Sequence, residues 1–269
     1  ILKLTGPLTI ENNTATNYGG AIAVHNVGSA EILASGGNIS IHDNNSARGG
    51  AFYLHNNDTL KLHAISSYPL EIFDNTASVS GGAGFADDGG YFDNYGQVRI
   101  YGNSALDGGA FYLTGGSKIW LDDYSFTFPE IFDNSAVNGG AIYALNSPLV
   151  RFDGAIVGSE LGGNQATWHG GALYLESSIM TAQNTAFINN QAADHGGAIY
   201  ALNSPLTISA NLNTPAINTF TETHDETLDD SFVQASACNP LTKECSVFAG
   251  NIADSNLDNN GQGGAIYLN

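Results

Sequence analysis

The chain has 269 residues, a length that suits one elongated domain. Its 7 Lys and Arg residues against 26 Asp and Glu residues give a formal net charge of −19, and the basic residues are scattered along the sequence. This charge argues against binding to nucleic acid or to an anionic membrane surface, because both need clustered cations. No apolar stretch is long enough to span a bilayer as a helix.

The two ends of the sequence both look like strands. Residues 1–4 form an apolar run that lacks the features of a signal peptide. The chain stops at Asn269, directly after a repeat strand and without the polar cap that a solenoid needs. We therefore expect the sequence to be part of a longer protein.

Between these ends the chain repeats itself. The tripeptide Gly-Gly-Ala occurs eight times; the first seven copies are 26 to 32 residues apart and the last step is 67 residues. The copies begin at Gly19, Gly49, Gly81, Gly108, Gly139, Gly170, Gly196 and Gly263. A fixed period of this size indicates one supersecondary unit stacked many times.

Each repeat also carries an asparagine ahead of its glycine pair, with a large apolar residue three positions before that asparagine. The asparagines are Asn13, Asn44, Asn75, Asn103, Asn134, Asn164, Asn190 and Asn251. We expect the asparagines to lie at turns, where this residue tolerates a left-handed backbone, and to bond one another from coil to coil. The paired glycines permit a tight corner.

Three short apolar, β-branched or aromatic runs in each period read as strands, and no stretch has a helical period. The sequence therefore predicts a right-handed parallel β-helix of about eight or nine coils over residues 1–269 as a single domain, with neighbouring strands about 4.8 Å apart. Two loops are expected to leave it: a short one at Asp87–Asn94 and an acidic insertion over residues 211–246.

Strand alternation places one tyrosine of most repeats on the outer face. If Phe111, Ile142 and Leu173 point inward, the tyrosines that follow them point outward. The predicted exposed stripe consists of Tyr53, Tyr112, Tyr143, Tyr174, Tyr200 and Tyr267. Such a stripe could stabilise the sheet as a stack or bind a protein partner.

The only two cysteines, Cys238 and Cys245, lie within the insertion. Their close spacing in a turn-forming stretch predicts a small disulfide loop, and two free thiols are the alternative. The acidic residues of the insertion could bind a divalent cation, but no ligand spacing supports this. We assign no metal site and no cofactor.

Parallel β-helices include polysaccharide lyases and hydrolases, so catalysis needs to be considered. Asp122 and Asp123 are adjacent, and neighbours on a strand point to opposite faces. His169 and His195 each precede a glycine pair and could stack. No basic cluster suits an acidic sugar and no nucleophile motif occurs, so we expect a protein that is not an enzyme.

Taken together, the repeats resemble those of the chlamydial polymorphic membrane proteins, whose signature pairs Gly-Gly-Ala-(Ile, Leu, Val or Phe) with Phe-x-x-Asn. Strict Phe-x-x-Asn occurs only at Phe187–Asn190 and Phe248–Asn251, and the copy at Gly81 has glycine at its apolar position. The residues that the resemblance implicates in adhesion are Gly19, Gly20, Ala21, Ile22, Gly139, Gly140, Ala141, Ile142, Phe187, Asn190, Gly196, Gly197, Ala198, Ile199, Phe248, Asn251, Gly263, Gly264, Ala265 and Ile266.

The resemblance implies part of an autotransporter passenger exported by a type V pathway. It implies an adhesin at the bacterial cell surface or outer membrane, or released from it. The expected partner is a host epithelial receptor, protein or glycan, with self-association as a second mode. Membrane contact is expected only through a barrel outside this sequence. The alternative from the residues alone is a passive stalk, and a β-helical lyase or hydrolase is a further one.

Overall fold

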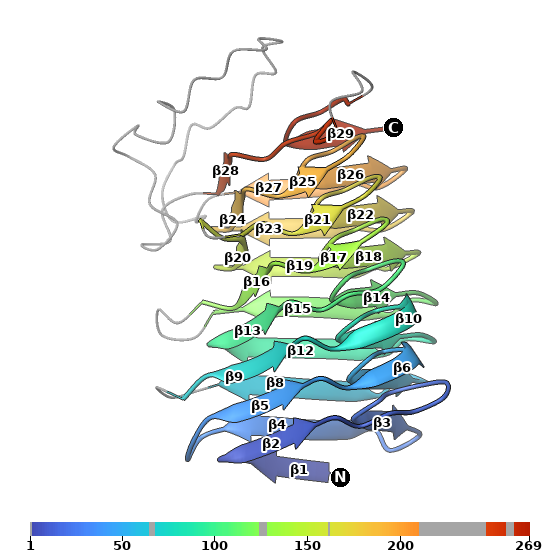
Figure 1. Cartoon of the computed structure of the whole chain (residues 1–269), viewed down its shortest axis with the longest axis vertical. Helices are drawn as coiled ribbons and strands as arrows, with labels where there is room; N and C mark the ends of the chain where they lie inside the picture. Colours follow the sequence, from blue (N-terminus) through green and yellow to red (C-terminus); the bar gives the residue numbers. More distant parts are fainter. Residues whose placement is uncertain (1, 65–67, 124–127, 161, 210–245, 257–260) are drawn as a thin grey trace.

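The computed structural model describes residues 2–64, 68–123, 128–160, 162–209, 246–256 and 261–269. Over these ranges the chain is all-β and winds into a parallel solenoid, with the N-terminus at one end of the stack and the C-terminus at the other (Figure 1). The described ranges contain no helix of the length and apolarity needed to cross a membrane.

Three parallel sheets of eight strands form the walls of the solenoid, and each coil contributes one strand to each sheet. The first sheet contains β1 (Leu2–Thr5), β4 (Ser29–Ala34), β8 (Thr59–Ala64), β12 (Tyr91–Gly96), β15 (Lys118–Asp122), β19 (Leu149–Asp153), β23 (Met180–Gln183) and β27 (Leu206–Ser209). The second contains β2 (Leu8–Glu11), β5 (Ile39–His42), β9 (Leu70–Phe73), β13 (Val98–Tyr101), β16 (Glu130–Phe132), β20 (Ile156–Gly158), β24 (Ala186–Ile188) and β28 (Val247–Ala249). The third contains β3 (Ile22–His25), β7 (Phe52–His55), β11 (Gly84–Ala86), β14 (Phe111–Leu113), β18 (Ile142–Leu145), β22 (Leu173–Glu176), β26 (Ile199–Leu202) and β29 (Ile266–Leu268).

A corner between the second and third sheets carries additional short strands that the sequence analysis did not predict. They are β6 (Asn45–Arg48) and β10 (Thr76–Ser80) in one ladder, and β17 (Ser135–Ala136), β21 (Gln165–Ala166) and β25 (Gln191–Ala192) in another. The backbone of this corner therefore pairs from coil to coil, as the strands of the three walls do. We call it the glycine corner because in every coil the segment ends at a Gly-Gly pair.

The predicted fold class is confirmed, and the stack is slightly shorter than expected. It runs through about seven turns, against the eight or nine coils predicted. Each sheet has eight strands, and eight strands are separated by seven coil-to-coil steps. A count of the eight motif copies in the sequence therefore gives one more coil than a count of the turns.

Alternation along the strands fills the interior with apolar side chains, as expected for half-buried strands. Phe111, Ile142 and Leu173 pair in register on neighbouring strands and have no exposed surface. The interior residues of all three sheets form one continuous hydrophobic core along the solenoid.

The predicted loop at Asp87–Asn94 is wrong. Only residues 87–90 form a turn, and β12 begins at Tyr91 and pairs with both β8 and β15. The ring of Phe92 enters the core and lies against Phe111, with 4.8 Å between ring centroids. A Cβ at Gly84 would meet both rings, which explains the glycine at the apolar position of this repeat.

The predicted asparagine ladder is present and buried. Asn75 Nδ2 donates to Asn103 Oδ1 at 3.0 Å, and Asn103 Nδ2 donates in turn to Asn134 Oδ1 at 3.0 Å. The backbone amide of each asparagine donates to the same oxygen, so these buried amides satisfy one another along the solenoid.

The left-handed backbone conformation does not belong to the ladder asparagines as predicted. It belongs to the residue before them in most coils, for example Asp74 with φ 52° and Asp133 with φ 54°. The ladder asparagine instead uses its side chain to bond the carbonyl two residues earlier, as Asn103 does with Tyr101. The tight turn and the ladder therefore use two adjacent residues.

The insertion predicted over residues 211–246 and the predicted disulfide between Cys238 and Cys245 lie outside the described residues, apart from Ser246. The Ser246 hydroxyl donates to the Ser209 carbonyl at 2.8 Å. The second sheet then resumes at β28, where Phe248 pairs with Phe187 in register.

Candidate functional site

An aromatic ladder covers the outer face of the third sheet. The six tyrosines of the predicted stripe lie in it, and Phe85 fills the place between Tyr53 and Tyr112. Successive rings from Tyr53 to Tyr267 stack with 4.5 to 6.0 Å between centroids. Stacking of this kind stabilises the sheet and fixes the rings in place.

The aromatic ladder is less exposed than the sequence predicts. Tyr53 and Tyr200 are only 9% and 8% exposed, because Tyr18 packs on the first at 4.4 Å and His169 on the second at 4.6 Å. Burial raises the pKa of Tyr53 to about 12, with Asp87 adding to the effect, and burial also raises the pKa of Tyr143. The remaining four rings are half-buried.

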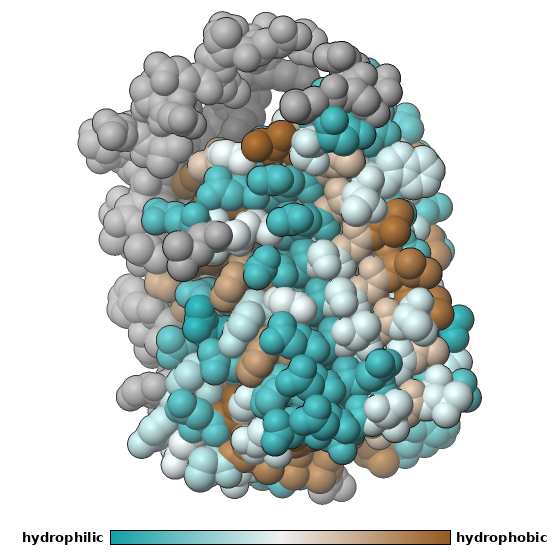
Figure 2. All heavy atoms as spheres, in the orientation of Figure 1, coloured by the Kyte–Doolittle hydropathy of each residue, from teal (hydrophilic) through white to brown (hydrophobic). Residues whose placement is uncertain are grey.

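An apolar ridge, made of Val79, Leu106, Val137 and Trp168, runs along the glycine corner beside this ladder. Each of the four residues stands two positions before a glycine pair. The backbone bonds of Val137 N to Leu106 O and of Trp168 N to Val137 O stack three of them on successive coils, and Val79 lies on the coil before, where Ser80 pairs with Asp107. Val79, Leu106 and Trp168 are 36%, 55% and 54% exposed. Figure 2 shows apolar surface along the right-hand margin, at the height of β14, β18 and β22.

The apolar ridge is not predicted from the sequence, although large apolar residues recur two positions before four successive glycine pairs. The repeated motif residues are the conspicuous ones in the sequence, whereas the ridge occupies a variable position between the asparagine and the glycine pair. Large apolar residues on four successive coils, three of them exposed and Val137 half-buried, form the kind of patch that a soluble surface usually avoids unless it binds something.

The residues of the implicated adhesion motifs lie mostly inside the solenoid. In the copies that begin at Gly139 and Gly196 the glycines, the alanine and the isoleucine are buried, and Phe187 and Asn190 have no exposed surface. Residues of the end copies are more open, and Gly264 is exposed. The motif therefore shapes the corner, and the side chains beside it supply the accessible surface.

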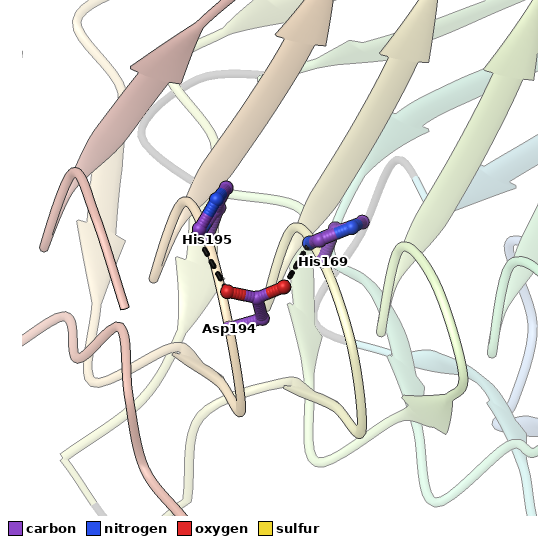
Figure 3. Close-up of side chains that lie close together, drawn as sticks. All are labelled: His169, Asp194 and His195. Carbon is purple, nitrogen blue, oxygen red and sulfur yellow. Dashed lines mark ion pairs between the residues drawn. The ribbon is translucent and has the colours of Figure 1, made fainter. Parts of the chain in front are cut away.

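A cluster of three metal-ligand side chains lies on the glycine corner where the aromatic ladder and the apolar ridge meet. His169 precedes β22 in one coil, and Asp194 and His195 precede β26 in the next (Figure 3). His169 Nδ1 lies 3.6 Å from Asp194 Oδ2, and His195 Nδ1 lies 2.6 Å from Asp194 Oδ1. Burial is the main cause that lowers the pKa of His169, which favours its neutral form.

A second cluster of metal-ligand side chains lies on the first sheet, at the carboxyl ends of the neighbouring strands β15 and β19. Carboxylate oxygens of Asp122, Asp123 and Asp153 lie within 4.8 Å of one another. The expectation that Asp122 and Asp123 point to opposite faces is wrong, because Asp123 follows the last residue of β15 and is no longer held by strand alternation. Oxygen ligands of this kind suit a hard cation.

Comparison with protein families finds the Chlamydia polymorphic membrane protein repeat at residues 7–25 and 184–202. Each match runs from the second sheet, through the glycine corner, to the third sheet, and so includes one ladder asparagine and one glycine pair. Comparison with curated proteins and comparison with solved structures find no match.

Proposed function

The chain carries the repeat of the Chlamydia polymorphic membrane proteins at two sites, which supports its membership of that family, and on this premise we propose that it is a surface adhesin. The family suggests a surface protein of the autotransporter type. The adhesin attaches the bacterium to host epithelial cells through a receptor on their surface. Its contact surface is the apolar ridge together with the exposed edges of the aromatic ladder.

The observation that carries this proposal is the exposure of Leu106 and Trp168 on the apolar ridge. Tryptophan and tyrosine are enriched among the few residues that dominate the binding energy of protein interfaces, and an exposed apolar patch around them marks an interaction site. Their neighbours on the ladder offer tyrosine edges that combine an apolar ring with a hydroxyl. This chemistry favours a protein receptor over a glycan, and repetition along the solenoid allows several weak contacts to act together.

A passive stalk is the main alternative. A stalk needs the hydrophobic core and the asparagine ladder, and both are satisfied inside the solenoid. It gains nothing from exposed apolar residues on successive coils, which carry a risk of aggregation. The apolar ridge is therefore the feature that favours a binding role.

A polysaccharide lyase or hydrolase fits less well. Among the described residues, Asp122, Asp123 and Asp153 converge, but the guanidinium of Arg151 already bonds Asp153 at 3.4 Å and stacks over Trp120. A lyase needs free cationic side chains to bind the substrate carboxylate. The proposal assigns no catalytic role to this chain.

The test is attachment of beads coated with residues 1–269 to cultured human epithelial cells. One variant carries Leu106→Ser and Trp168→Ser. A matched control carries Val27→Ser and Ile179→Ser, which remove two comparably exposed apolar residues from another part of the surface. A third coat lacks residues 211–246, the predicted insertion.

We expect saturable binding that soluble fragment blocks, a loss of about 10-fold or more in the ridge variant, and no loss in the control, because buried hot-spot contacts dominate interfaces. Equal binding by the ridge variant would contradict the assignment of the contact surface. No binding above an inert β-helix would support the stalk. Light scattering on the same proteins shows whether the ridge instead pairs two copies.

A further inference from the structure

The cluster of His169, Asp194 and His195 joins two neighbouring coils. Gly170 N donates to His195 O at 2.9 Å, which places the two histidines at equivalent positions one coil apart. No other coil has histidine at this position; the corresponding residues elsewhere are Tyr18, Arg48, Ser80, Asp107, Asn138 and Gln262. The cluster is therefore a local feature of these two coils and not part of the repeat.

The geometry of the cluster differs from that of a hydrogen-bonded pair. His169 Nδ1, Asp194 Oδ1 and His195 Nδ1 are shielded from solvent, and none of them makes a hydrogen bond with a described residue. His195 Nδ1 nevertheless lies 2.6 Å from Asp194 Oδ1. At the same separation His55 Nδ1 and Asp87 Oδ1 do form a hydrogen bond elsewhere on the solenoid.

Nitrogen and oxygen atoms that converge in pairs of opposite charge, without a hydrogen bond between them, are placed as ligands of a common third atom would be. In a tetrahedral zinc site with bonds of about 2.0 to 2.2 Å, neighbouring ligand atoms lie about 3.3 Å apart. The contacts of 3.6 Å from His169 to Asp194 Oδ2 and of 2.6 Å from His195 to Asp194 Oδ1 use different oxygens and lie on either side of this value. One ligand atom from each of the three residues lies within 4.8 Å of the other two.

We propose that His169, Asp194 and His195 bind a divalent first-row transition metal ion such as Zn²⁺. Two imidazole nitrogens and one carboxylate are ligands that zinc accepts and that calcium and magnesium do not prefer. Three protein ligands leave a further coordination position for water. The net charge of −19 also draws cations to the surface.

The surroundings hold the ligands in place. His169 stacks on Tyr200 at 4.6 Å and on Trp168 at 4.8 Å, and His195 packs against Tyr267 at 4.5 Å. Rings fixed by such neighbours lose little freedom when an ion binds. The ion ties one coil to the next, so it stabilises the solenoid near its C-terminal end. This role is independent of adhesion.

The test is titration of the untagged 269-residue chain with ZnCl₂, followed by calorimetry and by thermal unfolding. Every protein carries Cys238→Ser and Cys245→Ser, so that thiols cannot take up the ion, and excess Ca²⁺ occupies exposed carboxylates. The site variants are His169→Gln and His195→Gln. The matched control is His55→Gln, which removes the hydrogen-bonded histidine of the similar pair.

We expect one zinc ion per chain and a rise in melting temperature of about 5 °C when zinc exceeds its dissociation constant 100-fold. Loss of a residue that only supports a ligand weakens metal binding about 10- to 100-fold. Each site variant removes a ligand itself and should weaken zinc binding by more than this, whereas His55→Gln should not weaken it. Co²⁺ bound in place of zinc reports tetrahedral coordination through its visible absorption bands, which the site variants should lose.

Site variants that bind zinc as the control does would overturn the proposal, and so would binding with no preference over Ca²⁺. Melting of the variants in chelator at the temperature of the parent shows that their fold is intact. A loss of zinc binding with intact attachment to cells would leave the adhesin proposal untouched, so the two can fail separately.

Discussion

At the scale of the residue, the aromatic ladder shows how one side chain both stabilises the sheet and becomes sensitive to pH. Tyr53 is stacked between neighbours and nearly covered, so its ionised form loses hydration. Asp87 adds a negative charge next to its hydroxyl, while Arg48 acts weakly in the opposite direction. The pKa of Tyr53 therefore rises from 10.0 to about 12.

This shift predicts a loss of stability in alkali. Because the folded pKa lies above the unfolded pKa, the stabilisation from neutral Tyr53 is complete below pH 10 and is lost as the pH rises from about 10 to 12. Urea unfolding at successive pH values should show this fall. Tyr53→Phe should reduce the fall by about 2 kcal/mol at its upper end. If the variant and the parent lose stability in parallel, Tyr53 does not contribute.

At the scale of the element, the glycine corner depends on the second glycine of each pair more than its conformation suggests. Gly140 has an ordinary backbone conformation, but a Cβ there would lie 2.6 Å from both the amide nitrogen and the carbonyl oxygen of Gln165 in the next coil. These are backbone atoms held by the ladder, so they cannot move aside without separating two coils.

Gly140→Ala should therefore destabilise the chain by about 3 kcal/mol or more. The matched control is Gly116→Ala, where φ is +81° and nothing lies within 4 Å of the added Cβ. Only strain in the backbone opposes this control change, and we expect it to cost about 1 kcal/mol. Thermal and urea unfolding measure both. Equal losses would mean that conformation, and not the approach of coils, selects the glycine pair.

The same scale shows what the sequence could predict. Strands and their stacking order follow from repeated short motifs, because the alternation and the glycine positions recur in phase. Strand β12 is not predicted because Asp87, Asp88 and the two glycines after them are residues typical of a loop. Its buried residues, Phe92 and Asn94, also differ from the residues at the same positions of the other repeats. The short strands of the glycine corner have too few residues to show a period.

The candidate site was harder to predict because it depends on contacts between coils. His169 was recognised as a possible neighbour of His195, but the place of Asp194 between them depends on how the corner turns. The apolar ridge likewise appears only when residues some 30 positions apart are brought into register. Periodicity predicts that such residues are stacked, but not which of them remain exposed.

At the scale of the whole molecule, each coil contacts only its neighbours, so the solenoid should tolerate the loss of one complete coil. Residues 135–164 form such a unit, because Ser135 pairs with Gln165 and Asn134 bonds Asn164 in the asparagine ladder. Removal of these residues joins Asn134 to Gln165 and places an identical asparagine at the same level. The three sheets then each have one strand fewer and keep their register.

We expect this deletion variant to fold with a β-type circular dichroism spectrum and to be shorter by about 5 Å in solution scattering, which is one strand spacing. Its stability should fall by roughly one coil-to-coil interface, since the energy of a repeat array is close to a sum of nearest-neighbour terms.

The control lacks residues 135–149, so that strands of the first sheet would have to stack on the corner. That control should not fold cooperatively, because a wrong register turns core residues toward solvent. If both deletions unfold the chain, stability depends on contacts beyond neighbouring coils, and the solenoid is not a modular rod.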